Sequence, residues 1–390
     1  MDGRTDGSLT IDGRAGVAGE IAARWPAGAR RYRVAVIGCG RIARQHAAVL
    51  STHPATELVA VCDVSREARD ALGAAHGVPE AARFAGYREL LDQVAPDVIH
   101  ICTWPDTHAE ITIAAAERGI HVYCEKPMAL DLRECDAMLA ACRRAGIALG
   151  INHHRRGDSR YLRARQLLAD GAIGQVRLLR AEHGGGGRRL MAMSTHLYDL
   201  YRFLAGDVAW VSGQVLAGGR EATAADIYEI PHEGPAAGDE VAVQFAFRSG
   251  VYGFHDGLGH VDVEVVGTHG RMLFWEGGAP RRPWPFGERR AIWTRHADGE
   301  FGRTARGAPD WQPLDGVSEE ELCQPRHAYA RSIDRFLRAI EGEGSPLCTG
   351  EDGRASIEMA LAIYASHFSG RRIALPLLAE RHPLAALAQE

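Results

Sequence analysis

Short apolar runs alternate with segments of helical periodicity through the first 150 residues of the chain. The runs lie at residues 34–37, 57–63, 97–103, 120–126 and 147–152. Continuous apolar runs of this length are typical of parallel strands that are buried on both faces. With the segment 87–93 in the series, strand and helix alternate six times, and 97–103 counts as the fourth strand. This alternation predicts a doubly wound parallel sheet.

The pattern changes after residue 152. From 208 to 275 apolar residues tend to alternate with polar ones, which predicts a large, mostly antiparallel sheet with one exposed face. Helices are expected at 161–169, 194–206, 327–341 and 351–368. The region 278–325 is rich in Pro, Gly, Trp and Arg and is expected to form loops.

We therefore predict an α/β chain of two domains. An N-terminal Rossmann domain with a doubly wound parallel sheet is expected at 31–152, and a C-terminal α+β domain with the large, mostly antiparallel sheet at 153–390. The helices at about 327–370 are expected to pack back on the first domain. Residues 1–30 have weak periodicity and are expected to form a flexible arm.

Charge and composition exclude several classes of protein. Lys and Arg number 45 against 50 Asp and Glu, whereas a nucleic-acid binder normally has a basic surface. No apolar run approaches the roughly 20 residues of a membrane span, and residues 1–20 lack the apolar core of a secretory signal. We expect a cytoplasmic protein that binds neither nucleic acid nor a membrane. The eight cysteines show no CxxC spacing, so we expect buried thiols rather than a metal site or a disulfide framework.

One lysine, Lys126, stands among 44 arginines. An arginine stays charged in any protein environment, whereas a lysine amine can shift its pKa and transfer a proton. In a chain that uses Arg almost everywhere, this lysine indicates a position whose role a guanidinium cannot fulfil. A surface lysine retained by chance is the alternative interpretation.

A GxGxxA sequence, GCGRIA at 38–43, follows the first predicted strand and opens a helix. Its glycines permit a tight turn and a close approach of the backbone to a pyrophosphate, and the helix N-terminus supplies amide donors. Asp63, 20 residues beyond Ala43, stands where a carboxylate accepts hydrogen bonds from the adenosine ribose. The predicted dinucleotide contacts here are Gly38, Cys39, Gly40, Arg41, Ile42 and Asp63. The Asp63 carboxylate favours NAD over NADP. Arg41 and Arg66 stand near it in sequence, so NADP stays an alternative cofactor.

Five further motifs extend this pattern along the chain. They are Glu125-Lys126-Pro127 after the fifth strand, Thr103-Trp104-Pro105-Asp106-Thr107-His108 after the fourth, Gly171-Ala172-Ile173-Gly174, His196-Leu197-Tyr198-Asp199 and Gly370-Arg371-Arg372-Ile373-Ala374-Leu375-Pro376. With the GxGxxA turn, they make residues 32 to 376 resemble the glucose–fructose oxidoreductase/inositol dehydrogenase (Gfo/Idh/MocA) family of NAD(P)-dependent oxidoreductases.

The resemblance implies hydride transfer between a nicotinamide and a carbinol or keto carbon of a sugar, aminosugar or cyclitol. Lys126 would hydrogen-bond the reacting oxygen and stabilise the developing alkoxide, and His196 would be the general acid–base. Pro127 is often preceded by a cis peptide bond in this motif. Further dinucleotide contacts implied by the resemblance are Thr103, Trp104, His108, Glu125 and Lys126. A homodimer or homotetramer that forms through the second domain's sheet is also implied.

The substrate side departs from the family pattern. Where the family has an aspartate four residues before the histidine, this chain has Ala192, which cannot hydrogen-bond a substrate. The candidate substrate residues are Arg155, Arg156, His183, Arg188 and Asp199. Two alternatives to the dehydrogenase stay open. One is a redox-neutral, NAD-dependent glycosidase, and the other is a non-catalytic, NAD-binding regulator.

Overall fold

A computed structural model of the chain describes residues 16–26, 28, 30–182, 190–256, 262–275, 291–295, 311–314, 325–378 and 382–387. The chain divides into two compact units. The first unit comprises residues 1–158 and 324–354, and the second comprises residues 159–323 and 355–390. The division therefore lies a few residues beyond the expected boundary at 152, and it runs through the C-terminal helical region rather than before it.

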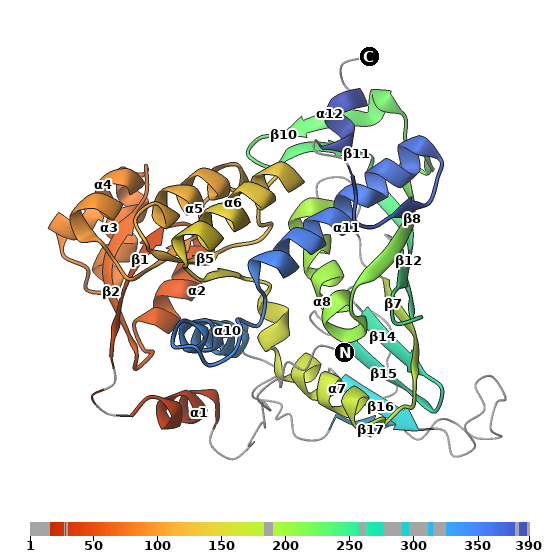
Figure 1. The fold of residues 1–390 in the computed structure, drawn as a ribbon, viewed down its shortest axis with the longest axis horizontal. Coiled ribbons are helices and arrows are strands. Elements are labelled where there is room, and N and C mark those ends of the chain that lie inside the picture. The colour runs from red at the N-terminus through yellow and green to blue at the C-terminus, as the bar shows by residue number, and fades with distance from the viewer. Residues whose placement is uncertain are drawn as a thin grey trace. The chain divides into compact units, whose positions relative to one another are not determined.

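The first unit contains a six-stranded sheet in the order β3-β2-β1-β4-β5-β6, among the residues that the structure describes. All five strand pairings are parallel. The strands are β1 (Tyr32–Ile37), β2 (Thr56–Cys62), β3 (Arg83–Phe84), β4 (Val98–Ile101), β5 (His121–Cys124) and β6 (Leu149–Ile151). The helices are α2 (Arg41–Leu50), α3 (Arg66–Ala75), α4 (Tyr87–Val94), α5 (His108–Ala116), α6 (Leu132–Ala145) and α10 (Pro325–Ile340), with α10 lying beside α2 (Figure 1). The predicted doubly wound parallel sheet is thus confirmed.

The third strand of the sheet does not lie at 87–93, where the sequence pattern predicted it. The segment 87–93 lies in helix α4, and the third strand is the two-residue β3, which pairs with β2. Leu90 and Leu91 on α4 are buried while their neighbours are exposed, as expected of a helix that packs one face. A segment of seven residues with two adjacent leucines fits a strand and a helix equally well by period alone, and in the structure it is helical from Tyr87, with Gly86 as the N-cap.

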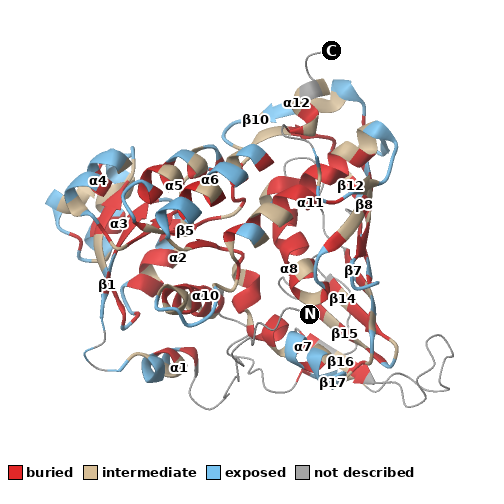
Figure 2. Cartoon of the chain, viewed as in Figure 1, coloured by how far each residue is buried: buried red, intermediate tan, exposed pale blue. Residues whose placement is uncertain are grey.

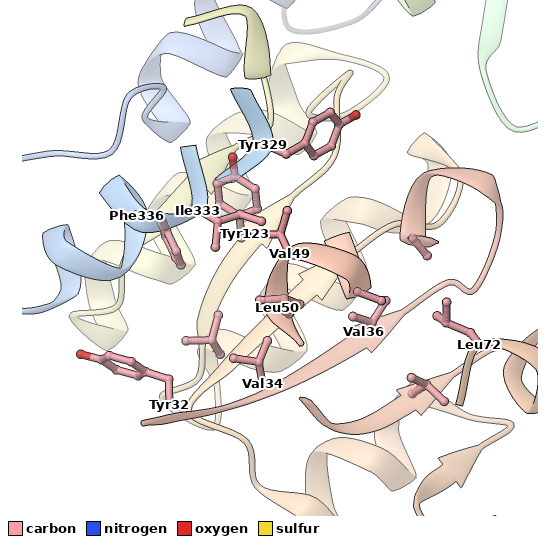
Figure 3. Close-up of a cluster of buried hydrophobic side chains, with 14 of the residues drawn as sticks. Tyr32, Val34, Val36, Val49, Leu50, Leu72, Tyr123, Tyr329, Ile333 and Phe336 are labelled. Carbon is pink, nitrogen blue, oxygen red and sulfur yellow. The ribbon is translucent and has the colours of Figure 1, made fainter. Parts of the chain in front are cut away.

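The core of the first unit joins β1 to helix α10, which comes almost 300 residues later. Figure 3 shows Ile333 and Phe336 of α10 pointing towards Val49 and Leu50 of α2 and towards Tyr123 of β5. Each of these side chains is buried or fully buried. Burial of one large apolar side chain contributes roughly 1.5–3 kcal/mol, so this cluster fixes α10 on the sheet.

Part of the N-terminal segment differs from the flexible arm that we expected over residues 1–30. Residues Gly16–Arg24 form helix α1, with Val17 and Ile21 buried. Directly after it, the Nε1–H of Trp25 donates a hydrogen bond of 2.7 Å to Oδ1 of Asp334 on α10. The period of the two apolar residues is helical, but the Gly and Ala around them weaken the signal, and so short a helix needs tertiary contacts such as those with α10 to be stable.

The second unit contains a ten-stranded sheet among its described residues, in the order β17-β16-β15-β14-β7-β13-β12-β8-β18, with β9 paired to β8. The strands are β7 (Val176–Glu182), β8 (Val208–Ala217), β9 (Arg220–Glu221), β12 (Glu240–Phe247), β13 (Tyr252–Asp256), β14 (Asp262–Gly267), β15 (Gly270–Trp275), β16 (Ala291–Arg295), β17 (Gln312–Pro313) and β18 (Ile373–Ala374). The pairing of β13 with β7 is parallel and the others are antiparallel, as the prediction of a mostly antiparallel sheet requires.

The other elements of this unit are α7 (Ser159–Ala169), α8 (Thr195–Ala205), α12 (Pro383–Leu387) and the hairpin of β10 (Ile227–Ile230) with β11 (Gly234–Ala237). Helix α11 (Gly350–Ser369) begins in the first unit and continues in the second. The expectation of loops over 278–325 is wrong for 291–295 and 312–313, which are β16 and β17. Alternation along β12 places Val241, Val243 and Phe245 in the core (Figure 2).

Within the described residues, no helix combines the length and the apolar character that crossing a membrane requires.

The contact between Trp25 and Asp334 predicts a pH-dependent contribution to stability. Burial alone raises the pKa of Asp334, but hydrogen bonds from His53 and Trp25 and the charges of His53 and Arg24 outweigh it, so this pKa lies below its usual value. The Trp25→Phe variant should lower the free energy of unfolding by about 1.5–3 kcal/mol at pH 7, since a hydrogen bond to a charged group is lost. The difference should shrink below about pH 4, as Asp334 becomes protonated.

Urea unfolding of both proteins between pH 3 and pH 7, with hydrogen exchange in α1 and α10 as the local measure, tests this prediction. Arg24→Gln is the control, because the partly exposed Arg24–Asp334 pair at 3.6 Å should contribute less than about 1 kcal/mol. A loss as large in Arg24→Gln as in Trp25→Phe would contradict the account.

Candidate active site

The turn after β1 requires a glycine for two reasons. Gly38 has a φ of +87°, and a Cβ added there would lie 2.6 Å from the carbonyl carbon of Cys102, which follows β4. The backbone of the turn is held from both sides, since the N–H of Gly38 donates to the carbonyl of Cys62 and the N–H of Cys102 donates to that of Ile37. The strand order reverses between β1 and β4, and ligands of such sheets bind at this point, outside the carboxyl ends of the strands.

The space beside Gly40 is open, whereas that beside Gly38 is filled by the backbone of Cys102. Gly40 is the N-cap of α2, its φ is −74°, and a Cβ added there would meet nothing within 4 Å. No side chain caps the helix, so the first-turn amides of Arg41, Ile42 and Ala43 keep their hydrogen-bonding capacity for a ligand. Open space over uncapped amides at a helix N-terminus fits the pyrophosphate of a dinucleotide.

Asp63, directly after β2, lies beside this turn. Its Oδ2 accepts a hydrogen bond of 2.6 Å from the Cys39 N–H, and its Oδ1 accepts one of 2.8 Å from the Ser65 N–H. The carboxylate therefore fixes the glycine turn, and each oxygen keeps a second lone pair for a ribose hydroxyl. Arg66, in the next helix, is largely exposed.

Glu125 occupies the carboxyl end of β5 but turns its side chain inward. The residue is 5% exposed, and its Oε1 accepts hydrogen bonds from Nδ2 of Asn152 at 2.6 Å and from Nε2 of His46 at 2.9 Å. Its Oε2 accepts the backbone N–H of Lys126 at 3.2 Å. Burial by itself raises the pKa of Glu125. These donors and the charge of Lys126 have a larger, opposite effect, so the pKa lies below its usual value, at about 2. Glu125 is therefore an ionised group inside the protein, and its contacts are with the chain itself.

Lys126 follows this buried carboxylate at the edge of the sheet, where it is partly exposed. The peptide bond between Lys126 and Pro127 is cis, as the resemblance implies. In the loop after the neighbouring strand β4, Trp104 is 54% exposed, whereas Thr103 Oγ1 accepts a hydrogen bond from Thr107 Oγ1.

His108, at the start of α5, connects the loops that carry Trp104 and Lys126. The ring is fully buried, with Nδ1 3.0 Å from the carbonyl oxygen of Pro127 and Nε2 3.2 Å from that of Thr103. Both ring nitrogens thus face backbone oxygens, which leaves neither for a dinucleotide. His108 holds the two loops together instead of making the cofactor contact that the resemblance implied.

The second unit carries His196 and Asp199 on helix α8, and both are buried. Their spacing of three residues places them on one face of the helix. Residues Leu190–Ser194, just before α8, form a π-helical turn that contains Ala192. Such turns are frequent at functional sites.

The candidate substrate arginines differ in their surroundings. Nη1 of Arg156 donates to the Leu347 carbonyl at 2.8 Å and to Oδ2 of Asp352 at 2.9 Å, and the residue is buried. Arg156 therefore stabilises the first unit, and its charge is already neutralised. Arg155 is buried as well. His183 and Arg188 lie outside the described residues.

Several polar residues of this region escaped the sequence analysis, namely His46, His100 and Asn152. All three are fully buried. A signal was present, because His100 interrupts the apolar run VIHI and His46 stands on the apolar side of α2.

Two cysteines near the glycine turn are buried, as the sequence led us to expect. Burial raises the pKa of the Cys39 and Cys62 thiols to about 12, so these groups behave as neutral core side chains.

Comparison with known proteins extends these observations to the whole chain. The model described as the oxidoreductase family's NAD-binding Rossmann fold matches residues 32–153, and that of its C-terminal alpha/beta domain matches residues 168–375. The 1,5-anhydro-D-fructose reductase of Ensifer adhaerens is 28% identical over 366 residues, which cover 87% of this chain and 97% of the relative. The myo-inositol 2-dehydrogenase of Thermotoga maritima is 24% identical, with coverages of 88% and 98%.

Among solved structures, the WlbA dehydrogenase from Bordetella pertussis, in complex with NADH and UDP-GlcNAcA, shares the fold. The TM-score is 0.66 at 22% identity, over 89% of this chain and 100% of that chain. Because the two family models together cover most of the chain, and the glycine turn has the geometry that they imply, the protein belongs to the Gfo/Idh/MocA family of oxidoreductases, with an N-terminal NAD-binding Rossmann domain and the family's C-terminal alpha/beta domain.

Proposed function

We propose that the enzyme transfers hydride between NAD and a carbinol or keto carbon of a sugar, aminosugar or cyclitol. The observation that carries this proposal is the position of Lys126, the one lysine of the chain. It follows a buried, ionised Glu125 at the ligand-binding edge of the sheet, where a cationic donor can meet a reacting oxygen. Two relatives that align over most of their length are named for action on an anhydro-sugar and on a cyclitol.

The chain's own groups have distinct roles in this proposal. NAD supplies the carbon that accepts or donates the hydride. The Lys126 ammonium hydrogen-bonds the substrate oxygen and stabilises its negative charge as the alkoxide develops. His196 takes the hydroxyl proton in oxidation and returns it in reduction, as an imidazole does near neutral pH. Asp199 and Arg155 are the substrate contacts that we retain, while the ion pair with Asp352 makes Arg156 a positioning residue.

The dinucleotide site supports NAD as the working cofactor. Asp63 places a carboxylate beside the glycine turn, where it would repel the 2′-phosphate of NADP. Trp104, exposed at the end of β4, adds an aromatic surface on the same edge of the sheet. The free thiols among the described cysteines suit the reducing cytoplasm, where we propose that the enzyme acts.

We further propose that the chain forms a homodimer or homotetramer through the outer face of its large sheet. On β13, Tyr252 and Phe254 are 45% and 39% exposed, while Gly253 and His255, which alternate with them, are buried. The Trp210 ring of β8 lies 6.2 Å from that of Tyr252, measured between centroids. Exposed aromatic side chains that gather on one sheet face are typical of a protein interface.

The Lys126→Met variant should lose turnover by at least about 10²-fold while it keeps its affinity for NAD, because the variant removes the donor to the reacting oxygen and leaves the glycine turn intact. Steady-state nicotinamide absorbance gives the turnover, and calorimetry gives the affinity. Lys126→Arg is the matched control that retains the charge but cannot shift its pKa, and it should also be slow. Unchanged turnover in Lys126→Met would refute the role of this lysine.

Gly40→Val should leave the fold intact and weaken NAD binding by at least about tenfold, because the new side chain enters open space that the pyrophosphate needs. The matched variant Gly38→Val should not fold, since its Cβ collides with the Cys102 backbone at a positive φ. Circular dichroism and calorimetric titration with NAD distinguish the two. Normal NAD affinity in Gly40→Val would place the dinucleotide elsewhere.

The double variant Tyr252→Glu/Phe254→Glu should reduce the mass in solution to that of the 42.3 kDa monomer, since charges on the aromatic face oppose its burial. Light scattering after gel filtration measures this mass. Tyr228→Glu is the control, because Tyr228 is 44% exposed on the separate β10–β11 hairpin, and it should keep the parent mass. A parent mass for both variants would exclude this face as the interface.

A further inference from the structure

A line of buried polar side chains runs from Lys126 into the sheet. Glu125 accepts from Nε2 of His46 on α2 at 2.9 Å, and Nδ1 of His46 lies 2.8 Å from Nδ1 of His100 on β4. Asn152, after β6, completes the set through its hydrogen bond of 2.6 Å to Glu125. All four residues are buried, and the two histidines and Asn152 are fully so.

The hydrogen-bond partners fix the direction of this line. The Tyr123 hydroxyl donates to Oδ1 of Asn152 at 2.9 Å, so the amide nitrogen of Asn152 points at Glu125. Nε2 of His100 has no hydrogen-bond partner among the described residues. A buried N–H without an acceptor costs more than an unused lone pair, so the proton of His100 is on Nδ1 and is donated to His46. His46 then carries its own proton on Nε2 and donates it to Glu125.

Glu125 needs these donors because neutral groups surround it. Burial lowers the pKa of His100 well below its usual value, and burial raises the pKa values of Tyr123, Cys102 and Cys124. Titratable and charged groups that interact with this line include His46, His100, Cys102, His108, Tyr123, Cys124, Glu125, Lys126, His154 and Tyr329, with Arg155 acting on His154 and Arg41 acting on Tyr329. Of the cations, Lys126 acts on Glu125 directly.

We propose that His46 is a positioning residue for Lys126: with its own proton fixed by His100, it anchors the Glu125 carboxylate, whose Oε2 accepts the Lys126 backbone N–H, so that this negative charge stays close to the lysine and keeps it protonated and oriented. The catalytic consequence rests on the proposed function of Lys126. The electrostatic link itself does not, because the charge on Lys126 can be measured without substrate. A histidine that only fills the core would affect stability and leave the titration of Lys126 unchanged.

The single lysine makes this measurement direct. Reductive methylation with ¹³C-formaldehyde labels Lys126 and the N-terminal amine of the full-length protein, and labelled Lys126→Met identifies the signal of the latter. The titration midpoint of Lys126 is then read by NMR as a function of pH. Two His46 variants of similar size separate the contacts. In His46→Gln the amide replaces Nε2 and keeps the bond to Glu125, whereas in His46→Asn it replaces Nδ1 and loses that bond.

We expect His46→Asn to lower the Lys126 midpoint by about one pH unit, because the Glu125 carboxylate loses its anchor and moves away from the lysine, and an opposite charge close by shifts a pKa by about one unit or more. His46→Gln should stay near the parent value. His100→Phe should lower the midpoint in the same direction, and His100→Asn, which keeps a donor at the Nδ1 position, should restore it. Equal midpoints in His46→Asn and the parent would overturn the proposal.

Glu125→Gln covers the case in which His46→Asn does not fold, as judged by circular dichroism. It should lower the Lys126 midpoint at least as much as His46→Asn, and an unchanged midpoint would overturn the proposal. The alkaline limb of the pH–kcat profile should move to lower pH in His46→Asn together with the midpoint. A midpoint that moves while turnover survives Lys126→Met would retain this electrostatic link and refute the proposed catalytic role of Lys126.

Discussion

An ionised carboxylate inside the protein is the constraint on which the active-site edge of the first unit depends. Glu125 is buried, and an uncompensated charge there would cost several kcal/mol. The compensation comes from donors on three elements: His46 on α2, Asn152 after β6 and the backbone of Lys126. Each donor must be in place for the charge to persist, so the same carboxylate fixes α2, β5 and β6 relative to one another.

The dinucleotide site follows from a second constraint, the close approach of two strand ends. The backbone after β4 touches Gly38 after β1, which excludes any side chain there, while the space over Gly40 is open. Asp63 binds the amide of Cys39 between them. The turn that we expect to receive a pyrophosphate is therefore held by backbone contacts and one carboxylate.

Much of this could be predicted from the sequence because the signals are local. The glycine turn, the aspartate after β2 and the Glu-Lys-Pro segment each follow an apolar run, and all lie at the carboxyl edge of the sheet. The line from His100 to Glu125 could not be predicted, since its members are separated by 54 and 79 residues and meet only after the strands are ordered. The role of Arg156 was missed for the same reason, because its partners, the Leu347 carbonyl and Asp352, are more than 190 residues away. The role of His108 was missed because its ring faces backbone oxygens, of Thr103 and Pro127, which no side-chain pattern reveals.

Helix assignments failed where the local signal was ambiguous. The segment at 87–93 could be a strand or a helix by period, and α1 packs on α10, with Trp25 bound to Asp334, through contacts that a local pattern does not reveal. Both errors concern elements outside the ligand-binding edge, so the chemistry that we derive does not depend on them. That chemistry is net hydride transfer at a carbinol or keto carbon.

The most direct test is the nicotinamide absorbance of the purified enzyme with a panel of sugars, aminosugars and cyclitols. NAD and NADP are compared as oxidants, and NADH and NADPH as reductants of the corresponding keto compounds. The account predicts a clear absorbance change with at least one member of the panel, larger with NAD than with NADP. No change with any member, in a protein that binds NAD tightly, would contradict it and would favour redox-neutral cleavage of a glycoside or a regulatory role.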